Sequence, residues 1–398
     1  MRATPKWIFL RSQIAAFALV LLIAGCATVA VSPTGTTPAP APAPTQGAWK
    51  FDASNRPPAD PDGYRPPVKL AVLLPLSGSL ASAAAPVRDG VLTGYYGESR
   101  RRPEIVFYDT AGTAGGALAA YDQAAAEGND FVLGPLGRDE VSAVFRQASL
   151  AVPMLALNRG NVAAPAGSAS FSLSPEDEGI AAAEYMIARN ARRALVIAST
   201  DDGMRRAVAT FRQRYTERGG NVVESVDVGE SVGEQTARLQ AIARMEGGID
   251  AVFLAVKGSQ ARALSPQFAA AGLGGKLRVG TSQLTSGTGD PVEDAVLDGI
   301  AFPTETWTAR GIPSLPSAAS VGERMKTARG PAARLFAFGY DAWQLVAYME
   351  RLAIDANGEI RGATGALRID GLGNVHRTPT WSTFSGGSPV PLADGDRR

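Results

Sequence analysis

The sequence predicts an α/β protein of two lobes, each built on a parallel sheet flanked by helices. The chain has 398 residues, enough for two domains, since domains usually contain about 100 to 200 residues. Hydrophobic residues make up 45% and charged residues 19%, as in folded globular proteins. From Val68 onward, short apolar runs alternate with amphipathic, Ala-rich stretches. A repeated strand–helix–strand order gives parallel sheets with right-handed crossovers.

Each expected strand is continuously apolar, which indicates that both of its faces are covered. The strands are expected at Val68–Leu74, Ile105–Tyr108, Phe131–Leu133, Met154–Leu157, Leu195–Ala198, Val222–Val228, Ala251–Val256 and Leu277–Gly280. The helices are expected near 86–97, 114–127, 138–149, 176–190, 203–218, 234–246 and 259–271. The fourth helix has a clear start, with Ser174 as the N-cap and Pro175 in the first turn.

This order of elements suggests how the two lobes divide the chain. Residues 68–174 are expected to form lobe 1, and the segment 300–355 is expected to return to it. Residues 175–299 are expected to form lobe 2, with a C-terminal hairpin at 360–390 joining that lobe. Segments that cross between two such sheets leave a cleft between the lobes.

The N-terminus has the pattern of an export signal. Three basic residues precede the apolar run Ile14–Ala24, which has the length of a signal-peptide core and is too short to span a bilayer. The run continues into Leu22–Cys26, which resembles the bacterial lipobox. This resemblance implies that residues 1–25 are a signal peptide and that Cys26 is lipidated. Ala27 stands where an Asp would favour the inner membrane, so we expect an anchor in the periplasmic face of the outer membrane.

Residues 26–67 are expected to form a tether, because ten prolines fall between Pro33 and Pro67 and no core can form from such a composition. Proline-rich chain extends by roughly 3 Å per residue, which would hold a domain well away from a membrane. The aromatic residues of this segment, Trp49, Phe51 and Tyr64, are expected to cover the first strand of the folded part.

Composition argues against several functions. The net charge of +1 supplies no basic field for nucleic acid. One Cys and one His exclude a disulfide within the chain and a zinc site of the Cys/His type. Phosphate-loop and Gly-x-Ser-x-Gly motifs are absent, and His376 is expected on the solvent face of a strand. We therefore expect no cofactor and no enzymatic activity.

Two kinds of resemblance refine this prediction. Val68–Gly78, Phe131–Leu136 and Val152–Asn158 resemble strand ends of the type I periplasmic-binding-protein fold, and the likeness extends from 68 to about 390. Arg334–Ala342 and Gly362–Asp370 resemble the LpoA/LppC lipoproteins, which are activators of class A penicillin-binding proteins. The second resemblance implies a lipoprotein that binds such a synthase and stimulates peptidoglycan synthesis.

Proteins of the LpoA type carry a helical-repeat domain before this fold. The 41 residues from Ala27 to Pro67 barely exceed one repeat of about 34 residues, and about three repeats are needed for a stable array. We therefore expect this chain to contain only the binding-protein-like part. The alternatives are a receptor for a small polar metabolite of the amino-acid type, and a passive envelope factor.

Candidate cleft-lining residues follow the expected strands of lobe 1, because ligands of open α/β sheets sit beyond the carboxyl ends of the strands. Ser77 and Ser79 could accept an anion such as a carboxylate, or simply cap a helix. Gly134 and Leu136 occupy positions where amino-acid-binding relatives usually carry hydroxyl groups, so half of the expected carboxylate clamp is missing.

Three further candidates complete the expected cleft. Asn158 ends the fourth expected strand. Asp201 and Asp202 stand at the start of the helix that follows the first expected strand of lobe 2. The two aspartates could hold an ammonium group or a metal ion, although N-capping explains one of them without any ligand.

Overall fold

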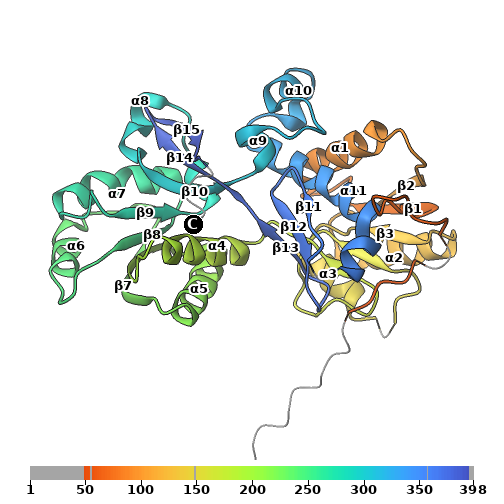
Figure 1. Cartoon of the computed structure of the whole chain (residues 1–398), viewed down its shortest axis with the longest axis horizontal. Helices are drawn as coiled ribbons and strands as arrows, with labels where there is room; N and C mark the ends of the chain where they lie inside the picture. The colour runs from red at the N-terminus through yellow and green to blue at the C-terminus, as the bar shows by residue number, and fades with distance from the viewer. Residues whose placement is uncertain (1–48, 54–55, 148, 356, 394–398) are drawn as a thin grey trace, which may run out of the picture. The chain divides into compact units, whose positions relative to one another are not determined.

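The computed structural model describes residues 49–53, 56–147, 149–355 and 357–393. The expected signal peptide, Cys26 and the tether as far as residue 48 lie outside the described residues. The α/β architecture with parallel sheets and flanking helices is confirmed, and Figure 1 shows the two lobes with their helices. All eight strands expected from the apolar runs are present.

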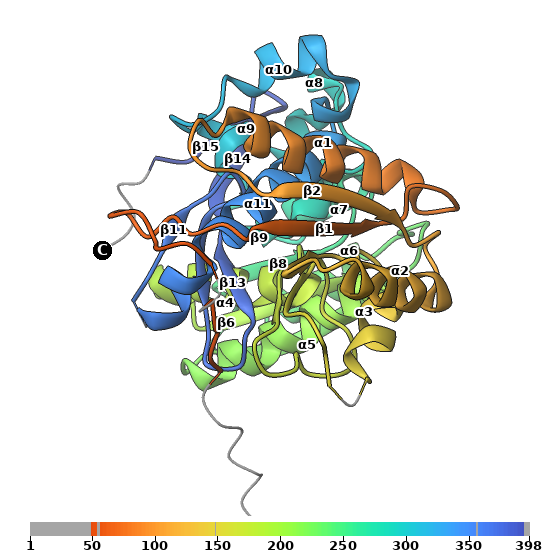
Figure 2. The same cartoon turned by 90° about the vertical axis from the view of Figure 1, so that its right-hand side faces the viewer.

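Lobe 1 contains a five-stranded sheet of order β2-β1-β3-β4-β5 in which every neighbouring pair is parallel. Its elements are β1 Lys69–Leu74, α1 Ala81–Gly97, β2 Glu104–Asp109, α2 Ala114–Ala126, β3 Phe131–Leu133, α3 Arg138–Phe145, β4 Met154–Ala156 and β5 Ala169–Ser170. Two apolar clusters cover the sheet, one on the side of α1 and the other on the side of α2 and α3. Figure 2 shows these layers with β1 and β2 in front.

Lobe 2 contains a seven-stranded sheet of order β15-β14-β10-β9-β8-β6-β7. Its parallel part and helices are α4 Pro175–Ala188, β6 Arg193–Ser199, α5 Asp202–Glu217, β7 Asn221–Val228, α6 Thr236–Ala243, β8 Ala251–Ala255, α7 Gly258–Ala270, β9 Leu277–Gly280 and β10 Ile300–Thr304. Short helices η1 Ser282–Thr285, α8 Pro291–Asp294 and η2 Ala295–Leu297 connect β9 to β10. Ser174 caps α4 as expected, accepting a hydrogen bond from the Asp177 backbone N–H.

The remainder of the chain passes between the lobes. It forms α9 Thr306–Arg310, α10 Ala318–Arg324, η3 Lys326–Ala328, α11 Ala332–Ile354, β11 Ile360–Arg361, β12 Ala366–Ile369, β13 Val375–Thr378, β14 Thr380–Ser385 and β15 Ser388–Pro391. Strands β11, β12 and β13 form a separate antiparallel sheet. Strand β14 then pairs antiparallel with β10 and joins the sheet of lobe 2.

The structure places two segments differently from the expected division into lobes. The segment 300–355 was expected in lobe 1, but its first strand, β10, pairs with β9 in lobe 2, whereas η3 and α11 pack on lobe 1. The segment 360–390 divides as well. Its strands β14 and β15 extend the sheet of lobe 2, whereas Leu367 and Val375 of the preceding hairpin are buried in the core of lobe 1.

The folded part also begins earlier than expected, because the described residues from Trp49 to Pro67 lie on lobe 1 rather than in a tether. The Phe51 ring contacts Phe131 edge-on, with 5.7 Å between the ring centroids. Tyr64 is 2% exposed and donates a hydrogen bond of 2.8 Å to the Arg101 carbonyl. These aromatic residues are therefore structural, as expected, and Phe51 belongs to the same apolar cluster as Leu70 and Val72 of β1.

Helices α1 and α11 pack closely in lobe 1, and glycines make this possible. A Cβ atom on Gly90 of α1 would lie 2.0 Å from the Phe336 carbonyl oxygen of α11. A Cβ atom on Gly339 of α11 would lie 2.0 Å from the Val87 carbonyl oxygen. The two helix backbones therefore touch, and this contact holds the N-terminal part of α11 at the edge of lobe 1.

Candidate functional site

The sheet order gives each lobe a topological switch point, which is where ligands bind in open α/β folds. In lobe 1 the strand order reverses between β1 and β3, and in lobe 2 it reverses between β6 and β8. Ser77 and Gly134 follow the first pair of strands, and Asp201 follows β6. Several of the predicted residues therefore lie at these positions, and their contacts show what each position can bind.

The anion-binding position after β1 is occupied by a carboxylate of the chain itself. Asp109 Oδ1 accepts hydrogen bonds from the backbone N–H groups of Leu76 at 2.9 Å and Ser77 at 3.2 Å. The Ser77 hydroxyl donates to Asp109 Oδ2 at 2.6 Å. This hydrogen bond is the main cause of the lowered pKa of Asp109. Ser79 is exposed in the turn before α1.

The positions after β3 and β4 are also paired internally. The Asn158 side-chain amide donates to the Leu136 carbonyl at 2.9 Å, so the structure brings these two predicted residues together. Gly134 has a φ of +108°, and a Cβ atom there would lie 2.0 Å from the Leu73 carbonyl oxygen. At the start of α3, Glu140 Oε2 accepts a 2.5 Å hydrogen bond from the Gly137 N–H. The N-terminus of α3 is therefore also paired with a carboxylate of the chain itself, as the turn after β1 is.

In lobe 2, Asp201 and Asp202 have different partners. Asp201 is the N-cap of α5, accepting from the Met204 N–H at 2.9 Å and from the Ser199 hydroxyl. Asp202 is exposed and forms an ion pair of 3.0 Å with Arg206 one turn along the helix. Asp201 therefore caps a helix, whereas Asp202 forms a surface ion pair.

Four charged side chains connect the lobes, three of them buried and Arg334 partly buried; we call them the interlobe charge cluster. They are Glu178 of α4, Glu305 at the start of α9, Arg334 of α11 and Arg377 of β13. Arg334 Nη2 lies 2.6 Å from Glu178 Oε1, and Arg334 Nε lies 3.1 Å from Glu305 Oε1. Ser282 strengthens the cluster, because its N–H at 2.9 Å and its hydroxyl at 2.7 Å both donate to Glu178.

The cluster is electrically balanced, and the pKa shifts show this. Burial alone would raise the pKa of Glu178, but the nearby Arg334 and Arg377 guanidinium groups offset this effect and lower the pKa. Burial would lower the pKa of Arg334, but Glu178 and Glu305 raise it. Glu178 and Arg334 therefore both stay charged at neutral pH. Because buried charges of this kind are costly to separate, the cluster holds α4 and α11 together.

The two sequence segments that resemble the LpoA/LppC lipoproteins meet in the structure. Asp341 of α11 is fully buried and accepts hydrogen bonds from the backbone N–H groups of Ala363 at 2.5 Å and Thr364 at 2.7 Å. The Thr364 hydroxyl donates to the same carboxylate at 2.5 Å. Burial raises the pKa of Asp341 to about 6. This contact positions the loop before β12 against the helix that carries Arg334.

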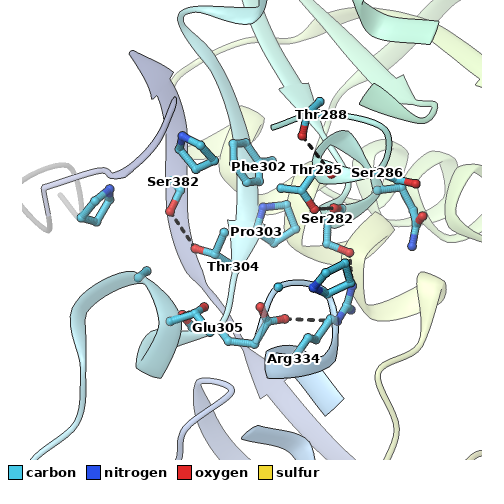
Figure 3. Close-up of a pocket in the computed structure, with 17 residues that line it drawn as sticks. Ser282, Thr285, Ser286, Thr288, Phe302, Pro303, Thr304, Glu305, Arg334 and Ser382 are labelled. Carbon is cyan, nitrogen blue, oxygen red and sulfur yellow. Dashed lines mark hydrogen bonds and ion pairs between the residues drawn. The ribbon is translucent and has the colours of Figure 1, made fainter. Parts of the chain in front are cut away.

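Beside the charge cluster lies a pocket of about 550 Å³, drawn in Figure 3. Its hydroxyl groups come from the segment after β9, from the neighbouring strands β10 and β14 and from α9, and include Ser282, Thr285, Ser286, Thr288, Thr304, Thr308 and Ser382. Glu305 and Arg334 form its charged end, and prolines of β10 and β15 form apolar walls. None of the seven predicted cleft residues lines this pocket.

The sequence itself contains a signal for this pocket, although the predicted cleft residues do not include it. The stretch Thr281–Asp290 follows the predicted strand Leu277–Gly280 and is rich in Ser and Thr. The rule that ligands sit beyond the carboxyl ends of strands applies to this strand as it does to the others. The contribution of β14 and β15 to the pocket could not be predicted in the same way, because it depends on pairing between residues distant in sequence.

His376 lies on β13 with its side chain 50% exposed, and its Nε2 is 2.7 Å from Asp370 Oδ2. Within the described ranges, no group of three or more His, Cys, Asp or Glu side chains is arranged to hold a metal ion. Among the helices of those same ranges, none combines the length and apolarity needed to cross a membrane.

The family model described as "LppC putative lipoprotein" matches residues 64–387. The chain belongs to this LppC family. A relative named penicillin-binding protein activator LpoA, from Photobacterium profundum, is 26% identical over 355 residues, which cover 82% of this chain and 57% of the relative. A relative of the same name from Vibrio vulnificus is 27% identical over 347 residues, covering 79% of this chain and 57% of the relative. The chain thus spans a little over half the length of these relatives.

Solved structures show the same fold. The C-domain of LpoA from Haemophilus influenzae, described as a regulator of PBP1A, matches with a TM-score of 0.69 and 20% identity, covering 82% of this chain and 100% of that domain. An ABC transporter substrate-binding protein from Sphaerobacter thermophilus matches with a TM-score of 0.59 and 17% identity, covering 82% and 97%. At these identities the likeness shows the type I periplasmic-binding-like fold, which activators and transporter proteins share.

Proposed function

We propose that this protein is a lipid-anchored regulator that binds a class A penicillin-binding protein and raises its rate of peptidoglycan synthesis. The observation that carries the proposal is the LppC match over residues 64–387, which spans nearly all of the folded part. The relatives that align with this region are named as activators of penicillin-binding proteins. The protein acts in this proposal without catalysing a reaction of its own.

The contacts at the predicted cleft support an activator over an amino-acid receptor. A receptor needs free donors for the carboxylate of its ligand, because an unpaired buried carboxylate is costly. Here the donors of Leu76 and Ser77 are used by Asp109, and the N–H of Gly137 is used by Glu140. Gly134 and Leu136 add no hydroxyl group. A receptor with this arrangement would have to displace its own side chains to bind an amino acid.

The anchor belongs to the same proposal and rests on Cys26. We propose that the diacylated Cys26 holds the protein in the periplasmic face of the outer membrane. The Pro-rich segment serves as the tether, and residues 27–48 are the part of it that precedes the folded region. Two acyl chains are enough for stable attachment, since a single chain gives only marginal binding.

Membrane fractionation combined with cross-linking in cells tests this proposal. The wild-type protein is expected to pellet with the outer membrane after a high-salt wash and to form a cross-linked product with a class A synthase. Cys26→Ala is expected to leave the membrane while the purified variant still binds the synthase. A Cys26→Ala protein that still pellets with the outer membrane would show that the anchor lies elsewhere.

A further inference from the structure

The structure points to a ligand site in the pocket of Figure 3, and we propose that this pocket binds a neutral saccharide. Its volume of about 550 Å³ lies within the roughly 300 to 1,000 Å³ of pockets that bind small molecules. The class of ligand follows from the hydrogen-bonding groups of the lining, from its charge balance and from its apolar walls.

The lining mainly offers hydrogen-bond acceptors. The hydroxyl groups of Thr285, Thr288 and Thr308 each donate to a nearby backbone carbonyl, at 2.9, 2.8 and 3.1 Å. A hydroxyl group has one proton and two lone pairs, so these side chains retain oxygen lone pairs after the proton is used. The pocket therefore suits a ligand that is rich in O–H or N–H donors.

Glu305 and Arg334 form the charged end of the pocket. Glu305 is 7% exposed, and its Oε1 has no hydrogen-bond donor, although it forms an ion pair with Arg334 Nε at 3.1 Å. Figure 3 shows both side chains at one end of the pocket. Because Oε1 is enclosed by protein atoms, its charge is compensated by the Arg334 guanidinium and not by a ligand, so this end of the pocket holds a closed ion pair.

The charge of the lining favours a ligand without net charge. Glu305 and Arg334 are the charged side chains among the residues that line the pocket, and they are paired with each other. Arg334 is also bound to Glu178 beneath the pocket. No charge remains to compensate a carboxylate, phosphate or ammonium group, and burying such a group unpaired is costly.

The remaining walls match the apolar faces of a sugar ring. Pro389 and Pro391 lie two residues apart on β15, so they face the same side of the strand, and Pro303 and Pro331 add further C–H surface. A pyranose combines C–H faces with a rim of hydroxyl donors, which matches the combination in this pocket. Amino acids, nucleotides and lipids each lack one of these properties or carry a charge.

The test uses the purified full chain and the disaccharide N,N′-diacetylchitobiose, with binding followed by isothermal calorimetry and ligand-observed NMR. The choice of an N-acetylated probe rests on the proposed function, because such sugars form the glycan strands of peptidoglycan. Glutamate and leucine are the comparison ligands. Saturable binding of the disaccharide, with none for glutamate or leucine, is the expected result. The absence of disaccharide binding, or equal binding of glutamate, would overturn the proposal.

Variants locate the binding to this pocket. The double variant Thr285→Val/Thr308→Val removes two exposed acceptors and is expected to weaken binding about tenfold, since each hydrogen bond contributes about 0.5 to 1.5 kcal/mol. Thr93→Val is the matched control, because Thr93 also donates to a carbonyl of its own helix but lies on α1, outside the pocket. Ala309→Phe is expected to abolish binding by filling the pocket, and urea unfolding checks that it folds. Unchanged affinity in the double variant would place the sugar elsewhere and contradict the proposal.

A parallel synthase assay separates this proposal from the proposed function. Disaccharide binding without stimulation of any class A synthase would leave the pocket proposal standing and remove the activator function. Stimulation of a synthase without disaccharide binding would support the activator function and overturn the pocket proposal.

Discussion

Arg334 shows how a single side chain connects the lobes. It reaches Glu178 of α4 and Glu305 of the crossing segment, and all three side chains are at most 20% exposed. Removal of one partner from a buried ion pair leaves the other charge buried and unpaired, which costs more than the pair itself contributes. Arg334 is the first residue of the segment Arg334–Ala342, which resembles the LpoA/LppC lipoproteins. The resemblance does not indicate that this residue forms a contact between the lobes.

Arg334→Met is therefore expected to lower the free energy of unfolding by about 3 to 5 kcal/mol. Arg368→Met is the matched control, because Arg368 forms a 2.9 Å ion pair with Glu359 but its side chain is 53% exposed. Exposed pairs contribute about 0 to 1 kcal/mol. Urea unfolding of both variants measures the difference, and equal losses would show that the cluster does not stabilise the fold.

Asp341 predicts a specific dependence of stability on pH. Burial raises its pKa from 3.8 to about 6, so the folded protein holds the Asp341 proton more tightly than the unfolded chain does. The stability that this proton contributes is complete below about pH 4 and is lost as the pH rises through 6.

The variant Asp341→Asn removes this titration. Relative to the variant, the wild-type protein is expected to lose up to about 3 kcal/mol of unfolding free energy between pH 4 and pH 7. Urea unfolding at each pH, with both proteins in the same buffers, isolates the Asp341 contribution from the other carboxylates. A difference between the two proteins that stays constant across this range would be inconsistent with the raised pKa.

At the scale of elements, the contact between α1 and α11 positions Arg334 and the pocket. Gly90→Ala would place a methyl group 2.0 Å from the Phe336 carbonyl oxygen, so the helices would have to separate. We expect a loss of about 1 to 3 kcal/mol, the usual cost of overpacking. Gly97→Ala is the control, because Gly97 also belongs to α1 but has nothing within 4 Å of its Cβ position.

Thermal or urea unfolding compares the two glycine variants. Gly97→Ala is expected to be neutral or slightly stabilising, since Ala favours a helix over Gly by up to about 1 kcal/mol. If Gly90→Ala were as stable as Gly97→Ala, the close packing of α1 on α11 would be wrong.

The elements that were predictable from the sequence are those with local signals. The strands β1 to β4 and β6 to β9 and their helices follow from continuous apolar runs and caps, because a buried parallel strand carries its signature within a few residues. The pairing of β14 with β10 joins residues about 80 apart, and no local pattern reveals it. Phe51 was assigned to the tether segment because its neighbours are Pro-rich, whereas its burial depends on Phe131.

The candidate site was less predictable for a related reason. Ser77 and Asp201 were found at the strand ends, but the sequence does not show that Ser77 bonds to Asp109 or that Asp201 caps α5. Such side-chain partners are set by the tertiary structure. The charge balance of the pocket likewise depends on residues from α4, α9 and α11 that meet only in the folded protein.

At the scale of the whole molecule, the folded part from Trp49 onward shares the fold of the C-domain of LpoA from Haemophilus influenzae, and the chain spans 57% of its relatives named as activators. The expected function therefore depends on whether this part alone is sufficient to stimulate a synthase. In the proposed function, the acylated Cys26 and the tether bring the folded part to the synthase, and the folded part makes the contact.

The most direct test is the rate of lipid II polymerisation and peptide cross-linking by the organism's purified class A synthases, measured with increasing amounts of the purified protein. We expect at least one synthase to form a cross-linked complex with it and to show higher rates that saturate with concentration. Unchanged rates and no complex for every class A synthase would contradict the proposed function.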